Sequence, residues 1–206
     1  NTAVGRSALS NNTTGADNTA LGYYSLLANT TGANNVAVGL CSLKAVTTGA
    51  TNVAVGRCTA INLTTGSNIL ALGDFAGSDA MVNFTATAAN TIALGNNNMT
   101  GSIIKVDWTV TSDLRDKMNI EDVPYGLDFV NQITPIKYDF KKSRENATPH
   151  GFTKYGFSAQ EILSLEGENP IIINNQDTNA LKMTNSHLLP VLVNAIKELK
   201  AENDSL

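Results

Sequence analysis

Short apolar stretches recur at a fixed spacing along the first hundred residues. Each stretch begins near an Asn, alternates apolar and small residues, and ends in a glycine, with the same seventeen-position step from Gly5 to Gly22, Gly39, Gly56 and Gly73. A second motif, Thr-Thr-Gly, keeps this period at Gly15, Gly32, Gly49 and Gly66. A unit of this length is too short for the paired helices of common helical repeats, and alternation is a strand period. The pattern therefore predicts one β-strand in every repeat.

Such a repeat predicts a β-solenoid, in which each repeat unit forms one coil. Two glycine-containing corners per coil supply the backbone conformations of sharp turns, and successive coils stack about 4.8 Å apart. We expect the recurring Asn side chains to hydrogen-bond up and down a column. A thin coil of small side chains buries little apolar surface, so we expect such a rod to self-associate and to need a cap.

The period breaks after Gly73. A last copy of the motif, Asn90–Gly95, follows after a longer step, which places a five-residue insertion within residues 74–89 and indicates an atypical terminal coil. Residues 96–102 read as a linker. Alternation at Ile104, Val106, Trp108 and Val110 predicts a strand that leads into a second part of the chain.

Residues after 112 have the pattern of a small α+β domain. Leu127, Val130 and Ile133 form a helical stripe, and Ile136, Tyr138 and Phe140 alternate as a strand. The polar segment 141–149 predicts a loop, and the apolar stretches 171–173 and 181–183 predict a hairpin. A closing helix is expected over about 185–203, with one apolar face formed by Leu188, Leu192, Ala195, Ile196 and Leu199. The predicted fold class is therefore mixed: a β-solenoid or β-roll shaft (1–95), a linker and strand (96–111), and an α+β domain (112–206).

Charge is confined almost entirely to the second part of the chain. The formal net charge is −4 and the pI about 5.1, so a basic surface for nucleic-acid phosphates is not expected. No apolar run approaches the roughly 20 residues of a membrane helix, and no signal pattern opens the chain. Because the sequence begins inside a repeat, we expect it to be a fragment. Neither a cofactor nor a metal site is predicted.

Cys41 and Cys58 occupy the same position of consecutive repeats, so their side chains should stack. A disulfide between them is geometrically conceivable. The simpler interpretation is two thiols that fill a column which elsewhere holds Ser7 and Tyr24, because two cysteines do not make a disulfide scaffold.

The segment Ser112-Asp-Leu-Arg-Asp-Lys117 concentrates the candidate chemistry. On structural grounds alone, Ser112 followed by an acidic residue is an N-cap of a short helix. A Ser and a Lys at this spacing are by themselves weak evidence for catalysis.

The repeat resembles the head repeats of trimeric autotransporter adhesins and similar repeats in tail fibres, over about residues 1–95. Those repeats, whose Asn-x-x-Ala-apolar-Gly motifs form a β-roll in each subunit of a trimer, are usually shorter than the repeat of this chain. The resemblance implies a homotrimeric shaft.

The second part resembles the intramolecular chaperone domain of phage endosialidases, tail fibres and neck appendages. That domain opens with Ser-Asp-x-Arg-x-Lys-x-x-Ile, matched from Ser112 to Ile120. Further similar segments are Ile133–Phe140, Tyr155–Glu161 and Leu188–Leu199. The family's domain trimerises, directs folding of the fibre, and then releases itself by autoproteolysis just before the motif serine.

The resemblance implies that the chain cuts its own Thr111–Ser112 bond as a serine endopeptidase. Ser112 would be the nucleophile and Lys117 the general base of a Ser-Lys dyad. A lysine takes this proton only if desolvation lowers the amine's pKa, so Lys117 should be partly buried in the assembled domain. Asp113 and Arg115 would either orient the site or pair for structural reasons.

Two histidines offer another arrangement. His187 begins the predicted closing helix and His150 lies in the polar loop, which favours surface or capping roles for both. A third catalytic residue is nevertheless left open.

These observations lead to one principal hypothesis: the end of a trimeric phage tail fibre or spike, with a folding domain that cuts itself off at Thr111–Ser112. It implies a virion location after assembly in the host cytoplasm, and a glycan or protein receptor on the host surface. The alternative is a bacterial trimeric surface adhesin that carries the same terminal domain. A glycan-degrading enzyme is disfavoured, because residues 1–111 contain few carboxylates and few aromatic residues.

Overall fold

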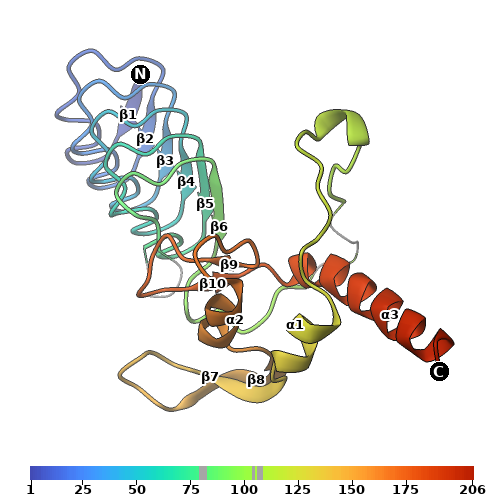
Figure 1. The fold of residues 1–206 in the computed structure, drawn as a ribbon. Helices are drawn as coiled ribbons and strands as arrows, with labels where there is room; N and C mark the ends of the chain where they lie inside the picture. The colour runs from blue at the N-terminus through green and yellow to red at the C-terminus, as the bar shows by residue number, and fades with distance from the viewer. Residues whose placement is uncertain (79–82, 104, 106–108) are drawn as a thin grey trace. The chain divides into compact units, whose positions relative to one another are not determined.

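The computed structural model describes residues 1–78, 83–103, 105 and 109–206 (Figure 1). The chain divides into two compact units, each described by itself below. The first comprises Asn1–Ser102 with Lys141–Gly151, and the second comprises Ile103–Phe140 with Phe152–Leu206. The domain boundaries predicted after residues 95 and 111 remain predictions.

Within residues 1–95, the described residues form the predicted β-solenoid. Its strands lie side by side in chain order (Figure 1): β1 (Thr2–Val4), β2 (Thr19–Leu21), β3 (Val36–Val38), β4 (Val53–Val55), β5 (Ile69–Leu72) and β6 (Thr91–Leu94). All neighbours are parallel. The register pairs Thr2 with Thr19, which lies one repeat later in the sequence. The last pair differs, because Ile69 pairs with Thr91, which lies one repeat plus five residues later. The insertion predicted before the last strand is therefore confirmed.

The interior of the solenoid is filled by columns of small and medium side chains. The Ala that recurs in each strand is buried from Ala20 to Ala93. Leu26 and Leu43, on consecutive coils, are fully buried. Glycine is required where coils approach closely, since a Cβ on Gly49 would lie 2.2 Å from the carbonyl oxygen of Gly66 on the next coil. The period of the sequence therefore records close contact between backbones.

A buried ladder of asparagines joins successive coils, as expected. The Asn35 amide donates to Asn18 Oδ1 at 3.1 Å, and the Asn52 amide donates to Asn35 Oδ1 at 3.0 Å. In the fifth repeat Ile69, and not the neighbouring Asn68, follows Asn52 in this column. The backbone N–H of Ile69 donates to Asn52 Oδ1 at 3.1 Å, while Asn68 binds Asn90 instead. The ladder thus ends on a backbone donor.

A second, shorter asparagine column explains an unsatisfied polar atom. The Asn29 amide donates to Asn12 Oδ1 at 2.8 Å and to the Gly32 carbonyl at 3.0 Å. Asn29 Oδ1 is buried without a hydrogen-bond partner. The residue one repeat further on is Val46, which is buried and offers no side-chain donor. The column changes from polar to apolar at this step, and the oxygen is left unpaired.

The second part of the chain confirms the predicted α+β class. Its elements are η1 (Leu114–Asp116), α1 (Leu127–Gln132), β7 (Ile136–Lys141), β8 (Pro149–Gly156), α2 (Ala159–Glu166), β9 (Ile173–Asn174), β10 (Lys182–Met183), η2 (Asn185–His187) and α3 (Leu188–Asp204). β7 pairs with β8, and β9 pairs with β10 in antiparallel register. The predicted helix at 127–133, strand at 136–140, loop, hairpin and closing helix are all present. β8 and α2 were not predicted.

A small core holds the second unit together. Its buried residues come from α1, α2, the β9–β10 hairpin and α3: Phe129, Ile162, Ile172, Ile173, Leu188 and Val191. Glu166, at the end of α2, is also buried and accepts hydrogen bonds from the backbone N–H groups of Ile171, Ile172 and Ile173. This carboxylate fixes the hairpin to α2.

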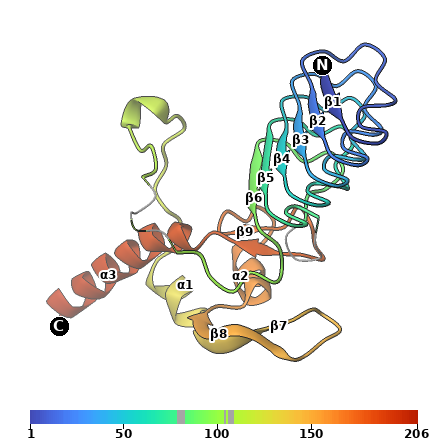
Figure 2. The same ribbon diagram turned by 180° about the vertical axis from the view of Figure 1, so that it is seen from behind.

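The long helix α3, shown from behind in Figure 2, has two apolar faces and not the single one predicted. One face is buried and includes Leu188, Val191 and Ala195. The other is exposed and consists of Leu189, Leu192, Val193, Ile196 and Leu199. The predicted stripe mixed residues of both faces, because the sequence does not say which side packs on α1.

The predicted strand at Ile104, Val106 and Trp108 lies outside the described residues. Within the described parts of the chain, no helix is long and apolar enough to cross a membrane.

Candidate functional site

The predicted cleavage motif folds into one short turn. Asp113 is the N-cap of η1, and its side chain accepts a hydrogen bond from the Arg115 N–H at 2.9 Å. At the other end, the Lys117 N–H donates to the Leu114 carbonyl at 3.1 Å. The purely structural interpretation placed the cap at Ser112, which is wrong by one residue. Asp113 serves this role because its carboxylate reaches the free N–H of the first turn.

This turn brings Ser112 and Lys117 together. Lys117 Nζ donates a hydrogen bond to Ser112 Oγ at 2.8 Å. The two residues are five positions apart, and the single turn of η1 between them folds the chain back on itself. The hydroxyl adjoins the Thr111–Ser112 peptide bond, so a nucleophile, a basic group and a peptide bond lie within one short segment.

Asp113 and Arg115 bind each other. The Arg115 guanidinium donates to both carboxylate oxygens of Asp113, with distances of 2.5 to 3.2 Å. This hydrogen bonding lowers the pKa of Asp113 and raises the pKa of Arg115. Arg115 was expected either to orient the site or to pair with Asp113 for structural reasons. Its charge is offset by Asp113, which favours the structural pairing.

The whole turn is exposed in the single chain. Ser112 and Lys117 are both exposed, and so are the apolar side chains of Leu114 (67%), Met118 (82%) and Ile120 (66%). The partly buried Lys117 expected for catalysis is therefore not a feature of one isolated chain.

The two histidines have different surroundings. His187 is the N-cap of α3, and its Nδ1 lies 2.9 Å from the Ile171 carbonyl. This contact links the hairpin to the helix. His150 lies in β8, and its Nε2 is buried without a hydrogen-bond partner. His187 therefore has the local structural role that its position suggested.

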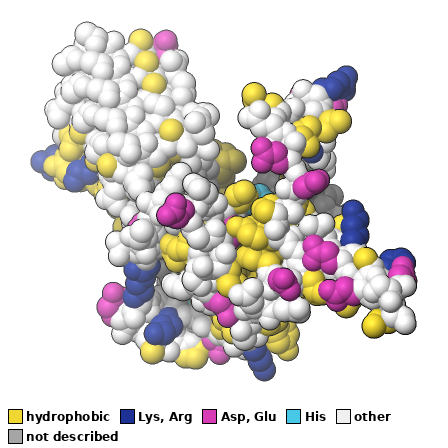
Figure 3. All heavy atoms as spheres, viewed as in Figure 1, with side chains coloured by type: hydrophobic (Ala, Val, Ile, Leu, Met, Phe, Trp, Pro, Cys, Tyr) yellow, Lys and Arg dark blue, Asp and Glu magenta, His cyan; other side chains and the backbone are white. Residues whose placement is uncertain are grey.

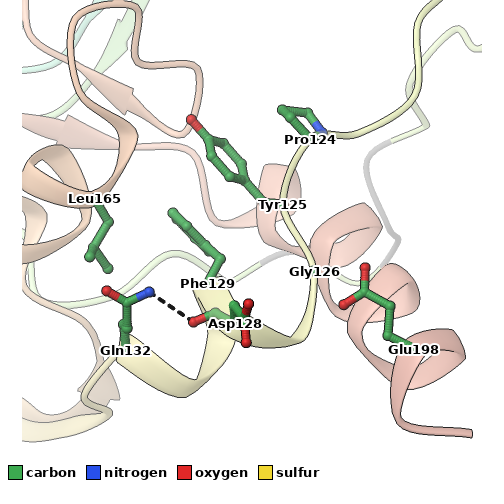
Figure 4. A pocket seen from close by; sticks show the side chains of 8 residues that line it. All are labelled: Pro124, Tyr125, Gly126, Asp128, Phe129, Gln132, Leu165 and Glu198. Carbon is green, nitrogen blue, oxygen red and sulfur yellow. Dashed lines mark hydrogen bonds between the residues drawn. The ribbon is translucent and has the colours of Figure 1, made fainter. Parts of the chain in front are cut away.

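A pocket of about 360 Å³ lies beside α1, and none of the predicted site residues lines it (Figure 4). The Glu198 carboxylate accepts from the Leu127 N–H at 2.6 Å, and the Gln132 side chain donates to the Asp128 carbonyl. The Glu198 carboxylate therefore satisfies a free N–H group at the start of α1. A second, apolar pocket of about 260 Å³ is lined by Val130, Ile133, Phe157 and the exposed-face residues Leu189 and Leu192 of α3.

Cys41 and Cys58 are free thiols on consecutive coils. Burial raises the pKa of the Cys58 thiol, and the neighbouring Cys41 raises it further. Within the described residues, no group of three or more His, Cys, Asp or Glu is placed to hold a metal ion.

Comparison with models of protein families finds a similarity in the second part of the chain. Residues 112–166 match the model of the family Peptidase_S74, described as the chaperone of endosialidase. No curated protein and no solved structure matches the chain. The match begins at Ser112, covers about a quarter of the chain, and ends with α2, so the predicted resemblance of Leu188–Leu199 lies outside it. Residues 112–166 are therefore similar to the endosialidase chaperone, and they start with the motif serine.

Proposed function

We propose that this chain is the terminal part of a trimeric phage tail fibre or spike, whose C-terminal part directs trimerisation and folding and then cuts itself off at Thr111–Ser112. The β-solenoid supplies the fibre shaft, and the match at residues 112–166 supports the chaperone and peptidase roles. The observation that carries the proposal is the 2.8 Å hydrogen bond between Lys117 Nζ and Ser112 Oγ, directly beside the bond to be cut.

The chemistry needs few groups. Neutral Lys117 takes the proton of the Ser112 hydroxyl, and Oγ attacks the carbonyl carbon of Thr111. The Thr111–Ser112 C–N bond breaks, the Ser112 nitrogen takes the proton from Lys117, and an ester joins Thr111 to Ser112 Oγ. Water then hydrolyses the ester and leaves a Thr111 carboxylate and a free Ser112 hydroxyl. Each chain is cut once.

Assembly would switch this reaction on. In the single chain Lys117 donates a hydrogen bond to Ser112, whereas a general base must accept a proton. Leu114, Met118 and Ile120, which are close to Lys117 in the sequence, have exposed apolar side chains. Another subunit that covers these side chains would also desolvate Lys117 and favour its neutral form. Cleavage would then follow trimer formation.

Two exposed apolar surfaces support self-association. On α3, Leu189, Leu192, Ile196 and Leu199 follow the 3-4-3 spacing of a coiled-coil seam. In the solenoid, the last apolar residue of each strand faces outward, including Val4, Leu21, Val55, Leu72 and Leu94, which are 39% to 56% exposed. A partner with the same coil period, namely another copy of the chain, fits this second surface along its length.

Mass measurement of the purified chain, denatured and native, tests the proposal. Wild type should give pieces of 111 and 206 − 111 = 95 residues, while Ser112→Ala and Lys117→Met should remain intact and trimeric. Ser102→Ala, which changes another exposed serine, is the matched control and should be cut like wild type. An uncut wild-type trimer would refute self-cleavage while leaving the assembly role standing, and a monomer would refute the assembly role.

The proposed location is the virion, after assembly in the host cytoplasm, and the proposed partner is a receptor on the host surface. The similarity of the repeat to adhesin heads favours a bacterial trimeric surface adhesin as the second candidate. Neighbouring genes for tail and baseplate proteins support the first candidate, and an upstream export signal with an outer-membrane anchor supports the second.

A further inference from the structure

The basic residues of the shaft gather at one corner of the solenoid. Residues 1–100 contain three Lys or Arg, and each lies over an aromatic ring of a neighbouring coil. Arg6 lies 5.8 Å from the Tyr23 ring centroid, Lys44 lies 5.5 Å from that of Tyr24, and Arg57 lies 4.9 Å from that of Phe75. In Figure 3, Lys and Arg side chains stand next to hydrophobic ones at one edge of the solenoid. We call Arg6, Tyr23, Tyr24 and Lys44 the basic corner.

The solenoid register explains why these residues meet. Tyr23 and Arg57 both occupy the position directly after the glycine that ends each strand, as does Arg6, and Tyr24 follows at the next position. The parallel register therefore places Arg6, Tyr23 and Tyr24 in two adjacent columns that run along the shaft, whereas Lys44 lies outside these columns and reaches the Tyr24 ring from the next coil. Residues distant in the sequence become neighbours every coil, about 4.8 Å apart.

Two of the three cations are available to a ligand. Arg57 is bound by Asp74 through two hydrogen bonds of 2.8 and 3.0 Å, and this contact lowers the pKa of Asp74. In the described part of the chain, Arg6 and Lys44 are not within ion-pair distance of any carboxylate. The basic corner therefore carries a local positive charge on a shaft that is otherwise almost uncharged.

The centre of the corner is a pair of tyrosines. The Tyr23 and Tyr24 ring centroids are 3.8 Å apart, and Tyr23 is 37% exposed. Rings of this kind present an apolar face and a hydroxyl that donates and accepts hydrogen bonds. Arg6 and Lys44 stand on either side of the pair, two coils apart, a separation of about 10 Å along the shaft.

We propose that the basic corner binds an acidic polysaccharide laid along the shaft. Negatively charged groups of two sugar units would pair with Arg6 and Lys44, and the sugar between them would contact the tyrosines. The corner is an open surface and the cations are spaced along the axis, which suits an extended polymer. Nucleic acid is a poorer fit, because so few cations in a chain of net charge −4 release few counterions.

The proposed ligand is the class of receptor that the fibre would bind. The inference rests on the proposed function in one respect, namely that the shaft is exposed on the fibre. Self-cleavage plays no part in it. Binding and cleavage are separate measurements, so either can fail without the other.

Binding of the purified full chain to immobilised alginate, a linear carboxylated polysaccharide, tests the proposal. Wild type should bind alginate and not neutral dextran, with affinity that falls as salt rises. The double variant Arg6→Gln/Lys44→Gln should lose at least tenfold in affinity. The charge-preserving Arg6→Lys/Lys44→Arg should retain most of it. Lys141→Gln/Lys142→Gln, which removes the same charge from exposed residues at the end of β7, is the matched control and should bind like wild type.

Several outcomes would overturn the proposal. These are no binding of alginate, equal binding of dextran, equal loss in the control variant, or equally tight binding of polyglutamate, which would indicate a non-specific anion site. Thermal unfolding of each variant must match wild type. A binding loss that accompanies a lowered unfolding temperature, without recovery in the charge-preserving variant, would show that the corner is only structural.

Discussion

Asp113 organises the turn at the predicted cleavage site. Its carboxylate accepts from the Arg115 backbone N–H and also binds the Arg115 guanidinium, so one side chain closes the turn twice. That turn returns the chain so that Lys117 reaches Ser112. The predicted catalytic pair therefore depends on a neighbouring residue that need not touch the reacting atoms.

The Asp113–Arg115 pair predicts a measurable titration shift. Arg115 lowers the pKa of Asp113, so Arg115→Gln should raise that pKa towards the ordinary aspartate value near 3.9. Because the folded pKa is depressed, the pair's stabilising effect is present above the ordinary pKa and is lost as pH falls through the folded pKa. NMR titration of the Asp113 carboxyl carbon in both proteins measures the shift. An identical pKa in the two would contradict the observed pairing.

The asparagine ladder is a hydrogen-bond network in the interior of the solenoid. Asn35 donates to Asn18 and to the Gly49 carbonyl, and its own oxygen accepts from the backbone and side chain of Asn52. Each rung thus joins three coils in the buried interior. Such short parallel strands form few ladder bonds, so these side chains hold the coils in register.

Removal of one asparagine from the ladder should lower the free energy of unfolding. Asn35→Ala leaves buried donors and acceptors on Asn18, Gly49 and Asn52 without their partners, and we expect a loss of about 3 kcal/mol in unfolding free energy. The control Asn62→Ala removes an exposed Asn and should cost less than about 0.5 kcal/mol. Chemical denaturation followed by circular dichroism compares the two. Similar midpoints for both variants would mean that the ladder contributes little.

The two apolar faces of helix α3 have different roles, because one packs within the subunit and the other is the proposed trimer seam. Val191 and Ala195 pack in the second unit, while Ile196 is 66% exposed in the single chain. Ile196→Asp should therefore leave the subunit folded but place an unpaired carboxylate in the proposed seam, where burial costs several kcal/mol. We expect loss of the trimer by analytical ultracentrifugation, together with reduced self-cleavage.

The matched control adds the same charge outside the seam. Ala201→Asp lies on an exposed part of α3, away from the 3-4-3 spacing, and should remain trimeric and cleaved. If Ile196→Asp stays trimeric as well, α3 is not the assembly surface.

In the assembled trimer, we expect cleavage to follow assembly. Ser112 and Lys117 are neighbours in the same chain, so each chain should cut only itself even inside a mixed trimer. Coexpression of tagged Ser112→Ala chains with wild-type chains should give mixed trimers in which only the wild-type chains are cut. Mass spectrometry of the separated chains measures this. Cleavage of the tagged Ser112→Ala chain would show that the nucleophile acts between subunits.

The second unit was predicted less completely than the solenoid. The stripe Leu127, Val130 and Ile133 correctly placed α1 but missed Phe129, which is the buried residue of that helix. α2 was missed, although Ser158 and Glu161 form the Ser-x-x-Glu pattern that marks a helix start, and Ser158 does cap it. Short elements with few repeats give weak periodicity, so tertiary contacts decide their limits.

The sequence alone determined the solenoid, its repeating register, the insertion before the last strand and the motif at Ser112, because a periodic pattern records contacts that repeat on every coil. The tertiary structure decided the side-chain contacts that a repeating sequence pattern does not encode. It placed Ile69 at the end of the asparagine ladder, assigned Asp113 to the cap and to Arg115, divided α3 into a buried and an exposed face, and gathered the shaft's cations on one corner. These features depend on which side chains meet in space, and a pattern along one chain specifies spacing but not partners.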